Sequence, residues 1–373
     1  MNLTERQQVF FALLKAGLWE KGTRLSQFSP IDFGALYKLA EEQSVVGLIA
    51  AGLEHIEDMT LTKPQVMPFM KNVIALESKN LSMDAFVSKL WAKMAETGIR
   101  SLLVKGQGIA QCYEKPLWRS CGDVDLFLDE ENYAKGKVYF ASVADHVHEE
   151  NLFDKHFSVD LDGFLVELHG SMRSMLTKRA DDYVDALQLD LFNKERHRIW
   201  DNNGTLISLP SPDEDIIYVF THILKHFFNY GIGLRQFCDL YRLLYTYHDE
   251  IDLSLLESRL QGMGMMTEWK VFAALAVHRL GMPPEYMPFY SPATTWKRKA
   301  DRVLSLVLET GNFGHNRDND YYQNSNSFVR GLKSFWRHTW DSIRQSFIFP
   351  LDSLRIWVRV LVLGFSDAMK GKN

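Results

Sequence analysis

The chain has 373 residues, of which 46% are hydrophobic and 24% charged, a composition ordinary for a soluble globular protein with two compact domains or with one core and helical additions. Its net charge of −5 gives no sign of a whole-protein affinity for nucleic acid. Three cysteines without C-x-x-C spacing argue against a zinc site or a disulfide framework, and the lack of a signal-peptide pattern or an apolar stretch of roughly 18 residues predicts a cytoplasmic protein.

Residues 1–98 form a predicted N-terminal helical region, because apolar residues recur in it at helical spacing. The longest pattern runs from about Lys63 to Gly98. Its apolar residues follow one stripe of the helix: Met67, Met70, Val73, Leu76, Leu81, Phe86, Leu90 and Met94. Gly98 follows the last of them and predicts the end of the helix.

Residues 99–210 carry the predicted strands. A short apolar run at 101–104 is followed by Lys105-Gly106-Gln107-Gly108 and by a predicted helix through Tyr113. Acidic and apolar residues alternate over 123–128, which is typical of a strand. Two predicted hairpins follow, 156–161 with 164–169 around Asp162-Gly163, and 198–200 with 206–209.

Helices return after Pro212, and residues 211–310 form a predicted helical domain. Residues 311–327 are rich in Asn, Asp, Gly and Ser and predict an exposed linker, so that 311–373 comprise a linker and a basic, aromatic helical tail. The predicted fold class is therefore α+β, with a small mixed β-sheet core flanked by N-terminal and C-terminal helical regions.

The tail carries eight Lys or Arg and three Asp residues over 328–373, a net charge of +5 that leaves −10 for the rest of the chain. Its apolar residues form two helical stripes: Leu332, Trp336, Trp340, Ile343 and Phe347, then Leu354, Trp357, Leu361 and Phe365. We expect these stripes to cover the acidic body of the same protein or of a second copy. Contact with a membrane surface is the alternative.

Asp123 and Asp125 point to the same side of their predicted strand, since successive side chains alternate faces. Two such carboxylates repel each other unless a cation is shared, and Mg²⁺ prefers hard oxygen ligands of this kind. A solvated polar strand face is the alternative. The turn Lys105-Gly106-Gln107-Gly108 at the start of a helix adds a predicted phosphate site, because its glycines let an anion approach the backbone.

Three segments resemble a known family. Residues 102–106 (LLVKG), 119–128 (RSCGDVDLFL) and 166–169 (VELH) are similar to the "LKG…R..GDiDLLV" and "VELH" segments of the uncharacterised nucleotidyltransferase family, within the DNA polymerase beta superfamily. His222, His226, Leu234-Arg235 and Asp239 are similar to that family's "H…H…LR…D" block. The resemblance covers about 102–244, and 119–128 is its most specific part.

The resemblance implies an enzyme that transfers a nucleoside monophosphate from a nucleoside triphosphate to an acceptor, which the sequence does not identify. It implies Asp123, Asp125 and Glu167 as catalytic ligands of Mg²⁺ or Mn²⁺, with Glu167 preferred to Asp160 as the third carboxylate. The expected nucleotide and phosphate contacts are Lys105, Gly106, Gln107, Gly108 and Arg119. The expected acceptor pocket comprises His169, His222, His226, Arg235 and Asp239.

Several alternatives stay open. Gln107 stands where the superfamily often has Ser or Gly, so an inactive module that binds a nucleotide or a partner is one alternative, and a D-x-D glycosyltransferase is another. Arg119 is expected either to hold a phosphate or to pair with Asp123. Arg235 and Asp239, four residues apart, predict an ion pair on one helix face. His222 and His226 lack the Glu of H-E-x-x-H, which excludes a zinc protease and favours a structural pair beside the cleft.

Overall fold

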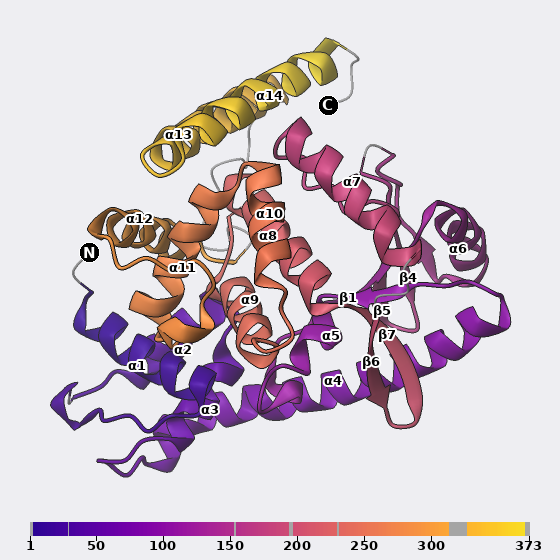
Figure 1. Cartoon of the computed structure of the whole chain (residues 1–373). Helices are drawn as coiled ribbons and strands as arrows, with labels where there is room; N and C mark the ends of the chain where they lie inside the picture. Colours follow the sequence, from indigo (N-terminus) through magenta and orange to yellow (C-terminus); the bar gives the residue numbers. More distant parts are fainter. Residues whose placement is uncertain are drawn as a thin grey trace.

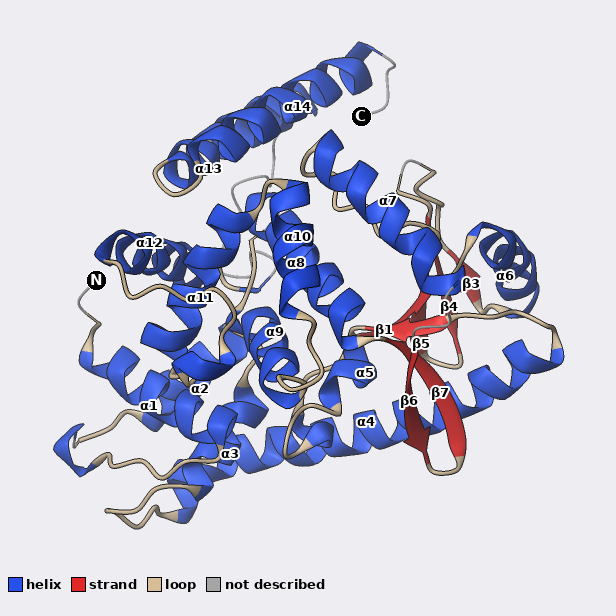
Figure 2. Ribbon diagram, viewed as in Figure 1, coloured by secondary structure: helices blue, strands red, loops and turns tan. Residues whose placement is uncertain are grey.

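The computed structural model describes residues 3–28, 30–152, 154–193, 197–229, 231–312 and 327–369. It is a mixed α and β structure in which helices surround a small sheet (Figures 1 and 2). This agrees with the predicted fold class at that level. Within the described ranges, none of the helices has the length and apolar character that crossing a bilayer requires.

The N-terminal region is helical, as predicted. It contains α1 (Glu5–Trp19), α2 (Phe33–Glu42), α3 (Val46–Glu54) and α4 (Lys63–Glu96). Helices α1 and α3 cross at glycines: a Cβ on Gly17 would meet Leu48 O at 2.0 Å, and one on Gly52 would meet Leu13 O at 2.1 Å. Helix α4 ends at Glu96, and Gly98 takes a φ of +67°, so the predicted helix end is confirmed within two residues.

Five strands form the main sheet, in the order β1-β2-β5-β4-β3. They are β1 (Leu102–Val104), β2 (Asp123–Phe127), β3 (His146–Val147), β4 (His156–Leu161) and β5 (Phe164–His169). Only β2 and β5 pair in parallel within this sheet. A separate pair contains β6 (His197–Asn202) and β7 (Thr205–Pro210).

Both predicted hairpins are confirmed. In each, the two turn residues have positive φ, at 51° and 81° for Asp162-Gly163 and at 52° and 90° for Asn203-Gly204. This conformation matches the twist of the flanking strands. One boundary was predicted wrongly: α5 (Gly106–Ala110) ends before Tyr113, where single-turn hydrogen bonds replace the helix.

The sheet separates two apolar cores. Val124, Leu126 and Leu168 point into a core shared with α4 and with α6 (Glu130–Val143), whereas Phe127 points into the larger core of the helical regions. Alternation along β2 therefore sends Asp123 and Asp125 away from the α4–α6 core. The larger core joins α1–α3 to the helices that follow the sheet, which are α7 (Lys178–Asn193), α8 (Pro212–Asn229), α9 (Leu234–Thr246), α10 (Leu253–Met263), α11 (Met266–Leu280) and α12 (Thr294–Thr310).

Helices α13 (Ser327–Ser346) and α14 (Pro350–Met369) pack against each other at the C-terminal end of the chain (Figure 1). Most of the predicted linker, residues 313–326, lies outside the described residues. The tail's stripes were predicted to cover the acidic body of this chain or of a second copy, and five of their members do not cover the body of this chain. Trp336, Trp340, Ile343, Phe347 and Leu354 are 46–62% exposed, because a different face, which includes Gln345, Phe349 and Ser353, packs inward. The side chains of Leu332 and Phe365 lie outside the described residues.

Candidate active site

Three carboxylates meet on one face of the sheet. Asp123 and Asp125 lie two residues apart on β2, and Glu167 lies opposite Asp125 on the parallel neighbour β5. One oxygen from each of the three lies within 4.8 Å of the others. Asp125 is buried, and Asp123 and Glu167 are half-buried. Three hard oxygen donors at this spacing suit Mg²⁺ or Mn²⁺, so the chemistry of the donor set fits a divalent metal.

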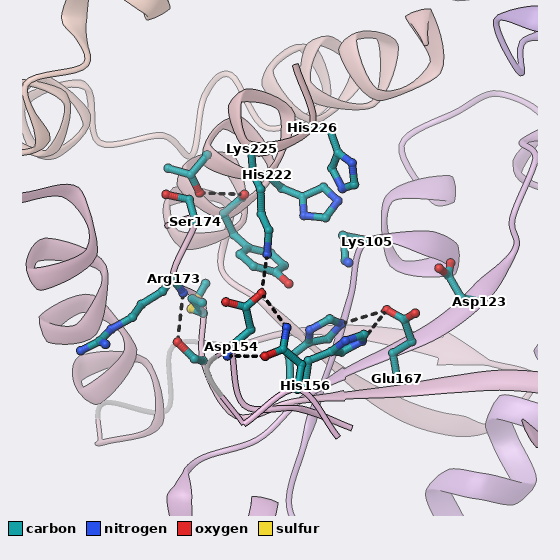
Figure 3. A pocket seen from close by; sticks show the side chains of 16 residues that line it. Lys105, Asp123, Asp154, His156, Glu167, Arg173, Ser174, His222, Lys225 and His226 are labelled. Atoms are coloured by element: carbon teal, nitrogen blue, oxygen red, sulfur yellow. Dashed lines mark hydrogen bonds and ion pairs between the residues drawn. The ribbon is translucent and has the colours of Figure 1, made fainter. Parts of the chain in front are cut away.

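A cavity of about 350 Å³ opens above this face (Figure 3). The sheet side contributes Asp123, Glu167 and His169, and α8 contributes Tyr218, His222, Lys225 and His226 from across the cavity. The segment after β5 closes a third side with Ser171, Met172, Arg173 and Ser174. Asp125 does not line the cavity, because Lys105 and His169 lie against its carboxylate.

Lys105 holds the buried carboxylate. Its Nζ lies 2.5 Å from Asp125 Oδ1 and 5.8 Å from the centre of the Tyr218 ring. Its backbone has φ 56° and ψ −140°, a conformation that residues other than glycine rarely adopt. Such local strain persists only where the surrounding structure enforces it, and it occurs frequently at functional sites. The turn from β1 into α5 thus aims the ammonium at β2.

Two histidines extend this network. His169 Nε2 lies 2.7 Å from Asp125 Oδ1 and 3.5 Å from Glu167 Oε2. His156 Nε2 lies 3.1 Å from Glu167 Oε2, and its ring stacks on that of His169 with centroids 4.9 Å apart. His156 was not among the residues predicted from the sequence. The two-residue turn at Asp162-Gly163 already sets the register that places His156 opposite His169, so the signal was available.

The pKa values of the three carboxylates shift in different directions. Repulsion from Asp125, together with burial, raises the pKa of Asp123. Burial alone would raise the pKa of Asp125, but the charge of Lys105 and the hydrogen bond with His169 lower it. Glu167 behaves like Asp125, since hydrogen bonds with His156 and His169 overcome burial and lower its pKa. Asp123 is therefore the carboxylate whose charge the site compensates least.

The α8 wall carries neutral imidazoles. Burial and the positive charge of Lys105 lower the pKa of His222 well below its usual value and that of His226 to about 3. The ring centroids of the two histidines lie 4.4 Å apart. Between them, Lys225 Nζ lies 3.2 Å from Asp154 Oδ2. Four cavity residues were not predicted from the sequence, because nothing in the local pattern relates them to β2: Asp154, Tyr218, Lys225 and Arg173.

The remaining predicted phosphate contacts lie elsewhere. Of the segment Lys105-Gly106-Gln107-Gly108, only Lys105 lines the cavity. The Gln107 side chain is buried, with Nε2 3.5 Å from Asn80 Oδ1. Gly108 packs against β7, where an added Cβ would meet Leu209 Cδ2 at 3.0 Å. In this structure Gly108 lets α5 pack closely against β7.

Arg119 forms a buried ion pair with Asp239, not with Asp123. Its Nε donates to Asp239 Oδ1 at 2.8 Å and its Nη2 to Oδ2 at 2.7 Å, and Tyr113 Oη donates to Oδ1 at 2.7 Å. Arg235 Nη1 donates instead to Ser120 O. The predicted Arg235–Asp239 pair is therefore wrong, and neither residue lines the cavity. Both arginines tie the chain just before β2 to α9, which fixes the strand that carries the aspartates.

One of three comparisons with known proteins found a match. A family model described as "Uncharacterised nucleotidyltransferase" matches residues 29–281, more than half of the chain. A search of curated proteins and a search of solved structures found no match. The matched range includes the whole sheet and all of the residues that line the cavity.

Proposed function

The chain belongs to this family of uncharacterised nucleotidyltransferases, and from that premise we propose that it transfers a nucleoside monophosphate from a nucleoside triphosphate to an acceptor. The observation that supports this proposal best is the convergence of Asp123, Asp125 and Glu167 within 4.8 Å of one another, below a polar cavity. We also assign the core to the DNA polymerase beta-type superfamily, because the paired aspartates and the third carboxylate lie on parallel neighbouring strands.

The three carboxylates would hold Mg²⁺ or Mn²⁺, which when bound neutralises phosphate charge and orients the triphosphate. Lys105 then gives up Asp125 and contacts the phosphates. Lys225, paired with Asp154, and Arg173, paired with Asp185, are further cations that line the cavity. The acceptor oxygen bonds to the α-phosphorus, the bond from that phosphorus to the bridging oxygen breaks, pyrophosphate leaves, and the hydroxyl proton is released to water.

A nucleotide-binding protein without turnover is the second candidate. The observation that favours it is the state of Asp125, which is 2% exposed and already neutralised by Lys105 and His169. The D-x-D glycosyltransferase is not supported, because α1–α4 precede the sheet where such an enzyme needs an α/β nucleotide-sugar domain.

Calorimetric titration tests the proposal. Each of the four common nucleoside triphosphates is titrated into the full chain with Mg²⁺, with Mn²⁺ or with a chelator. We expect metal-dependent binding that Asp123→Asn and Glu167→Gln abolish. Asp160→Asn is the matched control, because Asp160 lies on β4 with its carboxylate paired to His148 at 3.1 Å, outside the cavity.

Transfer is measured with triphosphates labelled at the α-phosphate, using the chain itself, small alcohols and nucleic acids as acceptors. Binding with transfer supports the enzyme. Binding with no transfer to any acceptor, and no release of pyrophosphate, supports the second candidate. A folded wild-type chain that binds no triphosphate with either metal contradicts both candidates.

A further inference from the structure

The outer face of the C-terminal helices is apolar and exposed. On α13 it comprises Trp336, Trp340 and Ile343, which are 61%, 62% and 46% exposed, and in the turn that follows α13 it includes Phe347, at 62%. On α14 it comprises Leu351, Leu354 and Val358, at 64%, 58% and 46%. We call these seven side chains the outer face. Single exposed apolar residues are ordinary, but a group containing two tryptophans and a phenylalanine marks an interaction surface.

The outer face points away from the rest of the protein. Gln345 marks the inward side of α13, since its Nε2 donates to Phe227 O at 2.8 Å, and buried Ser353 and Ile356 mark that of α14. With 3.6 residues to a turn, Trp336, Trp340 and Ile343 lie roughly half a turn around α13 from Gln345. Leu351, Leu354 and Val358 lie roughly 100° to 160° around α14 from Ser353. Ser342 Oγ donates to Ser353 O at 3.0 Å and Trp357 Nε1 to Thr339 Oγ1 at 3.0 Å, which joins the helices side by side. The hairpin lies across one end of the molecule (Figure 1).

Basic residues flank this face. Lys333 and Arg337 lie beside it on α13, and Arg355 and Arg359 lie beside it on α14. Residues 328–373 carry a net charge of +5, in contrast to −10 for the rest of the chain. A helix with aromatic and aliphatic residues on one face and Lys or Arg beside them is suited to the boundary between lipid headgroups and acyl chains. Tryptophan is enriched there because its ring is apolar and its N–H is polar.

We propose that the outer face docks on the surface of an anionic lipid bilayer, lying in the interface without crossing it. Pairing of the outer faces of two copies fits less well, because it brings two basic tails together. Elsewhere in the described ranges, the row of exposed apolar residues along α4 (Met67, Ile74 and Leu81) contains no aromatic ring and offers no matching partner. The proposal is independent of nucleotidyl transfer.

Flotation of the full chain with vesicles tests it. We expect co-flotation with vesicles of phosphatidylcholine and phosphatidylglycerol, weaker binding in high salt, and little binding to phosphatidylcholine alone. Trp336→Gln with Trp340→Gln should lower the partition coefficient by about tenfold or more, since both rings leave the apolar layer. Arg355→Gln with Arg359→Gln should weaken binding to anionic vesicles only. Ile74→Gln with Leu81→Gln on α4 is the matched control and should float like the wild type.

The state of association in solution is measured in parallel by light scattering. A folded wild-type chain that does not float with anionic vesicles overturns the proposal. A wild-type chain that is a dimer, does not bind vesicles, and becomes a monomer when both tryptophans are replaced also overturns it. That result would assign the outer face to contact with a second copy. Circular dichroism shows whether the exposed substitutions leave the helices folded.

Discussion

The carboxylate site on the sheet and the outer face of the C-terminal hairpin are exceptions to two different tendencies of folded proteins, which expose charged groups and bury large apolar ones. The sheet buries Asp125 and half-buries two further carboxylates beside it, whereas the hairpin leaves two tryptophans and a phenylalanine in water. Burying charge and exposing large apolar groups both oppose folding, unless partners compensate them. The site contains its own partial compensation in Lys105 and His169, whereas the outer face stays 46–64% exposed even though Arg302 lies over the Phe347 ring at 5.9 Å.

The two regions therefore need different kinds of ligand. At the site, Asp123 is the carboxylate without an ion pair among the described residues, and its charge is suited to binding a small cation. At the hairpin, apolar surface area is exposed beside positive charge, and such a face is suited to binding an extended surface. Substitutions that remove the negative charge of Asp123 or the exposed apolar side chains of the hairpin should impair binding and leave the fold intact.

The largest expected effect is loss of transfer in Asp123→Asn. A lost metal ligand removes several kcal/mol of transition-state stabilisation, so turnover should fall by at least about a thousandfold. Without metal, the free energy of unfolding of this variant should equal or exceed that of the wild type, because the repulsion that raises the pKa of Asp123 is gone. Label transfer and urea denaturation in a chelator measure the two effects.

Asp125→Asn sharpens that result. Asp125 pairs with Lys105, whose side chain is 15% exposed, so the variant leaves a buried ammonium without its nearest anion. We expect the same loss of turnover together with destabilisation of about 3 kcal/mol. Equal stability in the two asparagine variants would contradict the distinction between a compensated and an uncompensated aspartate.

The next effect concerns a buried ion pair outside the cavity. Asp239→Asn keeps an acceptor for Tyr113 but leaves Arg119 buried without its anion, and should lower the free energy of unfolding by about 3–5 kcal/mol. Adding Arg119→Met should restore most of the loss. Lys135→Met, in an exposed pair with Glu131, should change stability by less than about 0.5 kcal/mol. If the double variant is no more stable than Asp239→Asn, the unpaired charge of Arg119 is not the cause of the destabilisation.

Local rules predicted what lies within one element or one turn. Alternation placed Asp123 and Asp125 on one strand face, and Asp162-Gly163 set a hairpin that carries Glu167 and His169. Parallel pairing of β2 with β5 joins segments about 40 residues apart, and no local pattern specifies it. The position of Glu167 therefore came from the family resemblance.

Long-range pairing also explains the errors. Asp239 binds Arg119, 120 residues away, and not Arg235 on its own helix, because the buried pair forms only when α9 packs beside the chain before β2. In the tail, periodicity grouped Trp336, Trp340 and Ile343 correctly. The predicted stripe on α14 does not match its exposed face, because Leu354 is exposed while Trp357 Nε1 donates to Thr339 on α13. Periodicity could not show which face turns inward, since the inward contacts include polar Gln345 and Ser353.

The smallest predicted effect lies where the hairpin meets the body. Burial and the neighbouring Asp352 of α14 raise the pKa of Glu268 on α11 to about 8. The folded chain thus binds a proton that the unfolded chain releases near pH 4.5, so this contact contributes most at low pH and is lost as pH rises through 8. We expect stability to fall by on the order of 2 kcal/mol between pH 6 and 8. Hydrogen exchange over α14 at both pH values measures it. Glu268→Gln should remove the dependence, whereas Glu257→Gln, at an exposed position on α10, should keep it. A Glu268→Gln chain with the same pH response as the wild type would assign that response to another group.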